Sequence, residues 1–190
     1  MAVDHDARRQ RIAEATAAVI ARDGLEAATI RRISAEIGGP TKIITYYFSD
    51  KRELLRFTWE CLARQYFQEV SACGTTDIVD SLLAMAAADE RSMLRWRVYA
   101  AFWDRATRDP VFAEIQRSHM EVALTHIGSV LRARDATRGD IERVSLMLNA
   151  AVQGISLQAL VDPKRWPAQR IRRALADQVE MLLARPAAEA

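Results

Sequence analysis

Residues 24–55 read GLEAATIRRISAEIGGPTKIITYYFSDKRELL, and this stretch decides the fold. Gly24 ends an amphipathic helix predicted over residues 8–23, and Thr29 is a good N-cap for a short helix after it. The Gly-Gly-Pro run at 38–40 breaks that helix. A second short helix then begins near Pro40, because proline is favoured at the first helical position. Two short helices joined by a glycine-containing turn predict a helix-turn-helix.

The second short helix leaves polar and aromatic side chains pointing outward, while its isoleucines face a core. These outward side chains belong to Thr41, Lys42, Thr45, Tyr46 and Tyr47. Between Thr29 and Arg52 there are five basic residues and two acidic ones. Cations around such a helix suit phosphate contacts with base contacts between them. A charged helical hairpin without DNA function would show the same pattern.

A resemblance separates these two interpretations. The motifs G-L-x-x-x-T-I-x-x-I from Gly24 and T-Y-Y-F-S-D-K-R-E-L-L from Thr45 resemble the N-terminal domain of the TetR family of transcriptional regulators. The match covers about the first 60 residues. It implies a DNA-binding domain over residues 1–48.

The resemblance also implies roles for single residues. Thr29 and Arg31 would lie beside the DNA backbone, and Thr41, Lys42 and Thr45 would reach base edges in the major groove. Tyr46 and Tyr47 would contact phosphate and sugar, and Lys51 would bind phosphate at the start of the next helix. Lys42 and Thr45 depart from the family's usual residues. We therefore expect them to set this chain's own sequence preference.

Residues 49–190 are predicted to form a larger helical domain for ligand sensing and dimerisation. Helical patterns cover 50–73, 77–88, 90–107, 111–134, 138–161 and 167–184. The predicted class is all-α, with about nine helices in total. RWRVYAAFWDRATRDP at 95–110 and AVQGISLQALVDP at 151–163 are similar to the BetI-like branch of the family. That branch consists mostly of repressors, and its best known member answers to choline.

The last two helical segments carry apolar stripes that fit a four-helix bundle between two chains. The residues expected in this dimer contact are Leu148, Ala151, Ile155, Ile171, Leu175 and Val179. The same stripes could instead complete a monomer core. Dimerisation is favoured because two-fold dimers read two half-sites one turn of DNA apart.

Aromatic residues in this half invite comparison with a cage for a quaternary ammonium group, although such spacing is more often core. The residues assigned to ligand binding are Tyr66, Trp96, Tyr99, Trp103 and Gln153. Gln153 belongs to a polar set with Asn149, Ser156 and Gln158, for which an interface role and a ligand role both remain open.

Nothing in the sequence indicates an enzyme, a cofactor or a metal site. No P-loop, GxGxxG, GxSxG or HExxH motif occurs, and His119 and His126 lie seven residues apart without further ligands. Two cysteines are too few for a disulfide framework, and no signal peptide or uninterrupted apolar run of 18 residues is found. The expected location is the cytoplasm.

These patterns predict a ligand-responsive regulator, most simply a repressor. It would bind a palindromic operator in double-stranded DNA as a homodimer and be released by a small molecule. A helical DNA-binding or adaptor protein without a ligand is the alternative.

Overall fold

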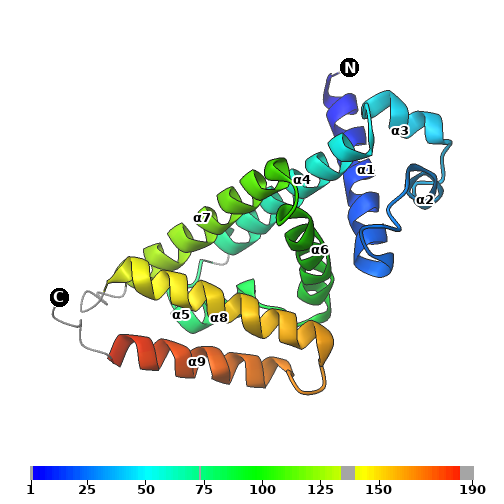
Figure 1. The fold of residues 1–190 in the computed structure, drawn as a ribbon. Coiled ribbons are helices and arrows are strands. Elements are labelled where there is room, and N and C mark those ends of the chain that lie inside the picture. The colour runs from blue at the N-terminus through cyan, green and yellow to red at the C-terminus, as the bar shows by residue number, and fades with distance from the viewer. Residues whose placement is uncertain (1, 73, 134–139, 185–190) are drawn as a thin grey trace. The chain divides into compact units, whose positions relative to one another are not determined.

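The computed structural model describes residues 2–72, 74–133 and 140–184. These residues form nine helices and no strand (Figure 1), which confirms the predicted all-α class and helix number. The helices are α1 (Ala2–Asp23), α2 (Ile30–Glu36), α3 (Thr41–Tyr47), α4 (Lys51–Ala72), α5 (Ile78–Met85), α6 (Glu90–Ala106), α7 (Pro110–Ala133), α8 (Ile141–Val161) and α9 (Ala168–Ala184).

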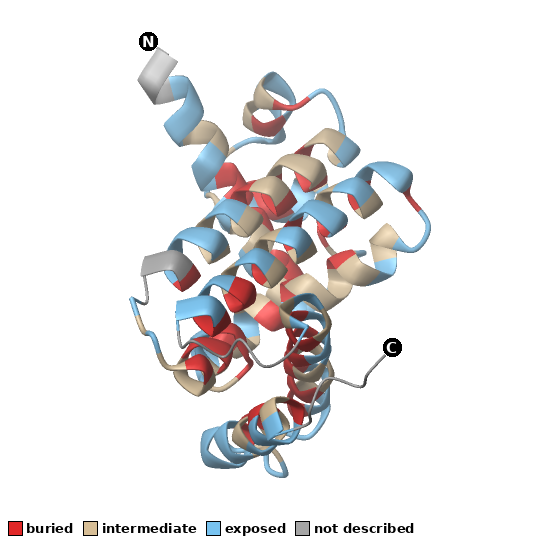
Figure 2. Ribbon diagram, turned by 90° about the vertical axis from the view of Figure 1, so that its left-hand side faces the viewer, coloured by how far each residue is buried: buried red, intermediate tan, exposed pale blue. Residues whose placement is uncertain are grey.

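The chain divides into two compact units. Unit 1 contains Met1–Gln65 and Arg97–Arg117, and unit 2 contains Tyr66–Trp96 and Ser118–Ala190. Helices α4, α6 and α7 therefore each begin in one unit and end in the other. Most helices carry buried residues on one side and exposed residues on the other (Figure 2), as expected for amphipathic helices packed around a core.

Unit 1 has one apolar core that joins the helix-turn-helix to four longer helices, α1, α4, α6 and α7. Ile33 of α2 and Ile44 of α3 are fully buried in it. Trp59 of α4 stacks on Phe102 of α6 at 4.7 Å between ring centroids, and Phe102 stacks on Phe112 of α7 at 5.8 Å. The first three helices thus share a core with parts of α4, α6 and α7.

Unit 2 is built around α5, α8 and α9, which pack on one another. Asp77 caps α5 and Asp140 caps α8 through their side-chain oxygens. The Ser156 hydroxyl of α8 accepts a hydrogen bond from the backbone N–H of Ala87 at 3.0 Å. Ser156 is therefore part of the interior of unit 2 and not of a surface, and Asn149 is also buried.

Helix α8 is long and apolar enough, by length and composition, to cross a membrane, and it is the one such helix among the described residues. However, 44% of its apolar window is buried within the protein, and Ser145, Asn149 and Ser156 are among its buried residues. These features are typical of the core helix of a globular protein.

Candidate nucleic-acid interface

Helix α2 begins at a cap that also places basic side chains at the surface. The Thr29 hydroxyl accepts a hydrogen bond from the backbone N–H of Arg32 at 3.2 Å, as predicted for an N-cap. The Arg32 guanidinium donates to Asp23 at 2.9 Å and lowers the pKa of that carboxyl. Arg31 is exposed and has no ion pair among the described residues. It lines a shallow depression of about 420 Å³ together with Thr29.

The turn between α2 and α3 depends on its glycines. Gly38 has φ +66°, a left-handed conformation that suits glycine. A Cβ on Gly39 would lie 2.9 Å from Cδ1 of Ile43. Pro40 is the N-cap of α3, with φ −70° and ψ 152°. The helix predicted to begin near Pro40 and Thr41 therefore begins at Thr41, with Pro40 just before its first turn.

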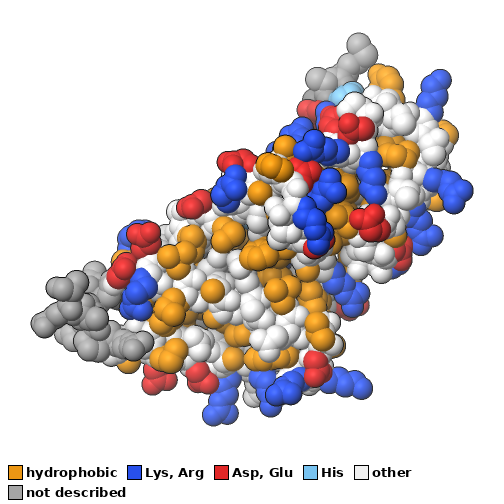
Figure 3. All heavy atoms as spheres, viewed as in Figure 1, with side chains coloured by type: hydrophobic (Ala, Val, Ile, Leu, Met, Phe, Trp, Pro, Cys, Tyr) orange, Lys and Arg blue, Asp and Glu red, His pale blue; other side chains and the backbone are white. Residues whose placement is uncertain are grey.

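Helix α3 buries Ile44 and leaves its other face to solvent. Thr41, Lys42 and Thr45 are exposed, and Tyr46 is 74% exposed, which is unusual for a tyrosine without a partner surface. Lys and Arg side chains stand out on the surface formed by α1 to α3, at the upper right of Figure 3. This arrangement leaves the outward face of α3 accessible.

A groove of about 520 Å³ lies between α1 and α3 and is lined by Arg8, Pro40, Lys42, Ile43, Tyr46 and Tyr47. The imidazole of His5 packs on the ring of Tyr47 at 4.8 Å and on that of Tyr46 at 6.5 Å. Sequence reasoning missed Arg8 and His5. The available signal was that Arg8 falls four residues before buried Ile12, at the edge of the buried face of α1.

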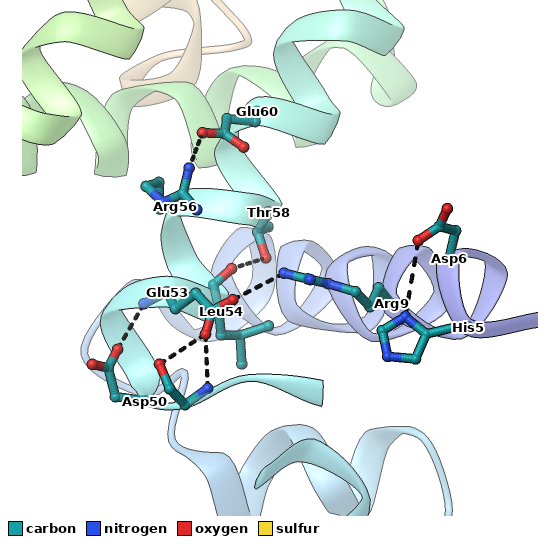
Figure 4. A network of polar contacts seen from close by, with 10 residues as sticks. His5, Asp6, Arg9, Asp50, Glu53, Leu54, Arg56, Thr58 and Glu60 are labelled. Atoms are coloured by element: carbon teal, nitrogen blue, oxygen red, sulfur yellow. Dashed lines mark hydrogen bonds and ion pairs between the residues drawn. The ribbon is translucent and has the colours of Figure 1, made fainter. Parts of the chain in front are cut away.

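Arg9 fastens α1 to the beginning of α4 (Figure 4). Its guanidinium lies 4.7 Å from the ring centroid of Phe48 and 4.5 Å from that of Phe57, and it donates to Glu53 at 3.0 Å. The Glu53 carboxylate also accepts from the backbone N–H and the hydroxyl of Ser49, and these bonds lower its pKa.

Lys51 is the first residue of α4. Asp50 caps this helix by accepting from the backbone N–H of Glu53 at 2.7 Å. The eight residues predicted to contact DNA all lie in unit 1 and are exposed or half-buried: Thr29, Arg31, Thr41, Lys42, Thr45, Tyr46, Tyr47 and Lys51.

The residues assigned to ligand binding do not gather in one unit. Tyr99 and Trp103 lie in unit 1, whereas Tyr66, Trp96 and Gln153 lie in unit 2. Tyr99 accepts a hydrogen bond from the Gln116 amide at 2.8 Å. Trp96 is buried and donates to the carbonyl oxygen of Met85 at 3.0 Å, as a core tryptophan does.

Tyr66 and Gln153 have different surroundings. Arg95 places its guanidinium 5.0 Å from the ring centroid of Tyr66, and His119 meets the same ring edge-on at 4.9 Å. Burial, helped by the charge of Arg95, lowers the pKa of His119 to about 4. Gln153 lies on the face of α8 that carries exposed Leu146 and Leu157, away from the buried face.

Five of the six residues predicted at the dimer contact are buried inside one chain. They are Leu148, Ile155, Ile171, Leu175 and Val179, and Ala151 is half-buried. Because these side chains pack in unit 2 itself, other residues of α8 and α9 must supply any surface for a second chain. This corrects the choice of residues, while dimerisation itself stays a prediction.

Comparison with known proteins agrees with the resemblance read from the sequence. Residues 12–56 match the bacterial regulatory proteins of the tetR family, and residues 76–184 match the C-terminal part of BetI-type transcriptional repressors. The chain is 27% identical to the HTH-type transcriptional regulator PksA of Bacillus subtilis strain 168 over 188 residues, which cover 95% of this chain and 92% of that protein.

Solved structures share the fold over nearly the whole chain. A transcriptional regulator from Rhodococcus sp. Rha1 has a TM-score of 0.81 at 28% identity and covers 93% of this chain and 96% of its own. A structure from Saccharomonospora viridis, described as a transcriptional regulator in complex with choline, has a TM-score of 0.81 at 21% identity, with coverages of 90% and 95%. The chain belongs to the TetR family and is a helix-turn-helix transcriptional regulator, not an enzyme.

Proposed function

We propose that this regulator is a repressor that binds a palindromic operator as a homodimer and is released by a small molecule. The observation that carries the proposal is the exposed face of α3, where Lys42, Thr45 and Tyr46 project. Arg8 lines the same groove as Lys42, and Arg31 and Arg32 line a second depression at α2. Thr41, Lys42 and Thr45 would read base edges, since a lysine can donate to guanine and a threonine methyl can touch thymine.

The remaining residues of the interface would bind the DNA backbone. Thr29 and Arg31 would contact it from the start of α2, and Tyr46 and Tyr47 from the end of α3. Lys51 would hold a phosphate at the N-terminus of α4, where unpaired backbone N–H groups favour an anion. In this proposal residues 1–48 form the DNA-binding domain, and residues 49–190 sense the ligand and dimerise.

An exposed stripe on α8 supports dimerisation. Leu146, Ala150, Leu157 and Val161 follow one another at spacings of four, seven and four residues, and all four are exposed. Met181 of α9 is also exposed. Large apolar side chains aligned on one helix face mark an interaction surface. A second copy placed against this stripe would provide the two-fold symmetry that a palindromic operator requires.

The effector is proposed to be a small apolar or amphipathic molecule bound in the sensing domain. Choline is the first candidate, because the Saccharomonospora viridis structure contains it. In this chain the Tyr66 ring is not open to the ammonium group of a ligand, since the Arg95 guanidinium already lies over it. We therefore place choline among the compounds to test and do not assign it as the ligand.

Release would follow from the connectivity of the helices. Because α4, α6 and α7 run from unit 2 into unit 1 without a linker, a ligand that prefers one arrangement of unit 2 biases unit 1 as well. A coupling of about 1–3 kcal/mol is typical of such systems. A regulator of this kind works where the chromosome is, in the cytoplasm.

Selection of bound duplexes from a random DNA pool tests the proposal. At about 0.15 M salt, non-specific phosphate binding is reduced, so enrichment reports base recognition. We expect one palindromic sequence to be enriched, and we expect choline or another small amphipathic compound to release it. K42A and K51A should each weaken binding, with K42A altering the selected sequence. A folded chain that enriches no duplex would favour an adaptor, and tight binding that no compound releases would favour a regulator without a ligand.

A further inference from the structure

The groove between α1 and α3 has the composition of an anion site. Arg8 and Lys42 supply positive charge from its two walls, and Tyr46 and Tyr47 supply phenol groups. None of the described residues that line it carries a carboxylate. A concave surface with two cationic side chains and without acidic groups favours an anionic ligand over a cation.

Arg8 is the residue of α1 that lines this groove. The next residue, Arg9, turns the other way and is held by Glu53, Phe48 and Phe57. Arg8 is half-buried, lines the groove, and has no ion pair among the described residues. Within the part of the chain that the structure describes, no carboxylate neutralises the charge of Arg8 by an ion pair.

His5 holds the first turns of α1 against the end of α3. Its ring packs on both Tyr47 and Tyr46, and the two tyrosine rings meet edge-on at 5.0 Å. Arg8 lies one turn further along the same helix. These aromatic contacts join the helix that carries Arg8 to the helix that carries Lys42.

We infer that this groove binds the sugar–phosphate backbone of the operator, and that Arg8 adds a phosphate contact from α1, outside the helix-turn-helix. The inference rests on the proposed function. Lys42 lies both in the groove and on the exposed face of α3, so a DNA strand whose bases are read by α3 would pass its backbone along the groove. A contact of this kind raises affinity for every sequence equally.

Equilibrium binding over a range of salt concentrations tests the inference with two probes: the duplex selected by the wild-type chain and a scrambled duplex of equal length. R8Q should weaken binding to both duplexes by the same factor and reduce the slope of log affinity against log salt by about 1. R8K should restore the slope. R8M keeps the apolar stem and should behave like R8Q, and melting temperatures verify that each variant is folded.

R11Q is the matched control, because Arg11 lies on the same helix, is exposed and does not line the groove. The inference fails if R8Q and R8M bind with the wild-type slope, or if R11Q lowers the slope as much as R8Q does. It also fails if R8Q changes the ratio of the two affinities, which would make Arg8 a base-reading residue. If the wild-type chain binds neither duplex, the proposed function fails together with this inference.

Discussion

Thr29 combines a structural role that is visible in its contacts with a DNA role that is proposed. Its hydroxyl caps α2 through the backbone N–H of Arg32. Aspartate is at least as good an N-cap as threonine, but its charge would repel a phosphate. We expect T29D to keep the thermal stability of the chain and to weaken operator binding, whereas T29A should also lower stability by about 1 kcal/mol.

Thermal melts and operator titrations of the same T29A and T29D samples separate the two roles of Thr29. Full operator affinity in T29D would show that this residue does not lie beside the DNA backbone. Loss of stability in T29D would mean that the cap requires threonine in particular.

His119 makes the stability of unit 2 depend on pH. Burial lowers its pKa to about 4, below the value of about 6.5 for an unfolded chain. Between these values the unfolded chain binds more protons than the folded chain, so stability falls as pH decreases from about 6.5 to 4. The loss amounts to about 3 kcal/mol, taking 1.36 kcal/mol per pKa unit.

Urea unfolding at pH 7.5 and pH 5.0 measures the part of this loss that falls above pH 5, about 2 kcal/mol. H119Q removes the titrating group and should flatten the difference in unfolding free energy between the two pH values, even if it lowers stability at both. H126Q is the control, because His126 is only half-buried and its pKa, also lowered by burial, should contribute less. An unchanged pH dependence in H119Q would contradict the assignment.

Single-residue exposure was largely predictable on α2 and α3, because helical periodicity fixes which side chains share a face. Ile33 and Ile44 are buried and Lys42 and Thr45 are exposed, as expected. Arg8 was not predictable in the same way. Its place depends on where α1 packs against α3, and a local pattern carries no information on packing between helices.

The helix boundaries show the same limit at the level of elements. Most predicted segments agree with the structure within a few residues, since caps and breakers are local signals. Two segments are exceptions: α1 begins at Ala2, six residues before the predicted start at residue 8, and the segment predicted over 77–88 ends at Met85. Ala86 adopts an extended backbone with ψ 167°, and the N–H of Ala87 is bonded to Ser156 of α8 instead of continuing the helix. A tertiary contact therefore overrides the helix propensity of an alanine-rich run.

The apolar stripes of α8 and α9 were recognised in the sequence, but their partner was not. Periodicity shows that Leu148 and Leu175 are buried, and both are. It cannot show whether the covering surface belongs to the same chain or to another one. In the structure that surface lies within unit 2, and the residues left exposed form a separate stripe on α8.

At the scale of the whole molecule, Gly154 lies beside the exposed stripe of α8. Contacts within one chain do not explain a glycine at this position. A Cβ at Gly154 would meet nothing within 4 Å, although glycine inside a helix costs about 1 kcal/mol relative to alanine. A second chain packed closely on α8 would explain it, because small residues let helices approach.

We therefore expect G154A to raise the stability of the isolated chain, and G154L and L157K to convert a dimer into a monomer. Molar mass from light scattering at micromolar concentration measures the change, and operator affinity should fall with it because a monomer contacts one half-site. L94K is the matched control, since Leu94 on α6 is 45% exposed, close to the 41% of Leu157, but lies outside the stripe. A dimer that persists in both G154L and L157K would place the contact on another surface. The two DNA-binding domains would then be arranged differently on a two-fold operator.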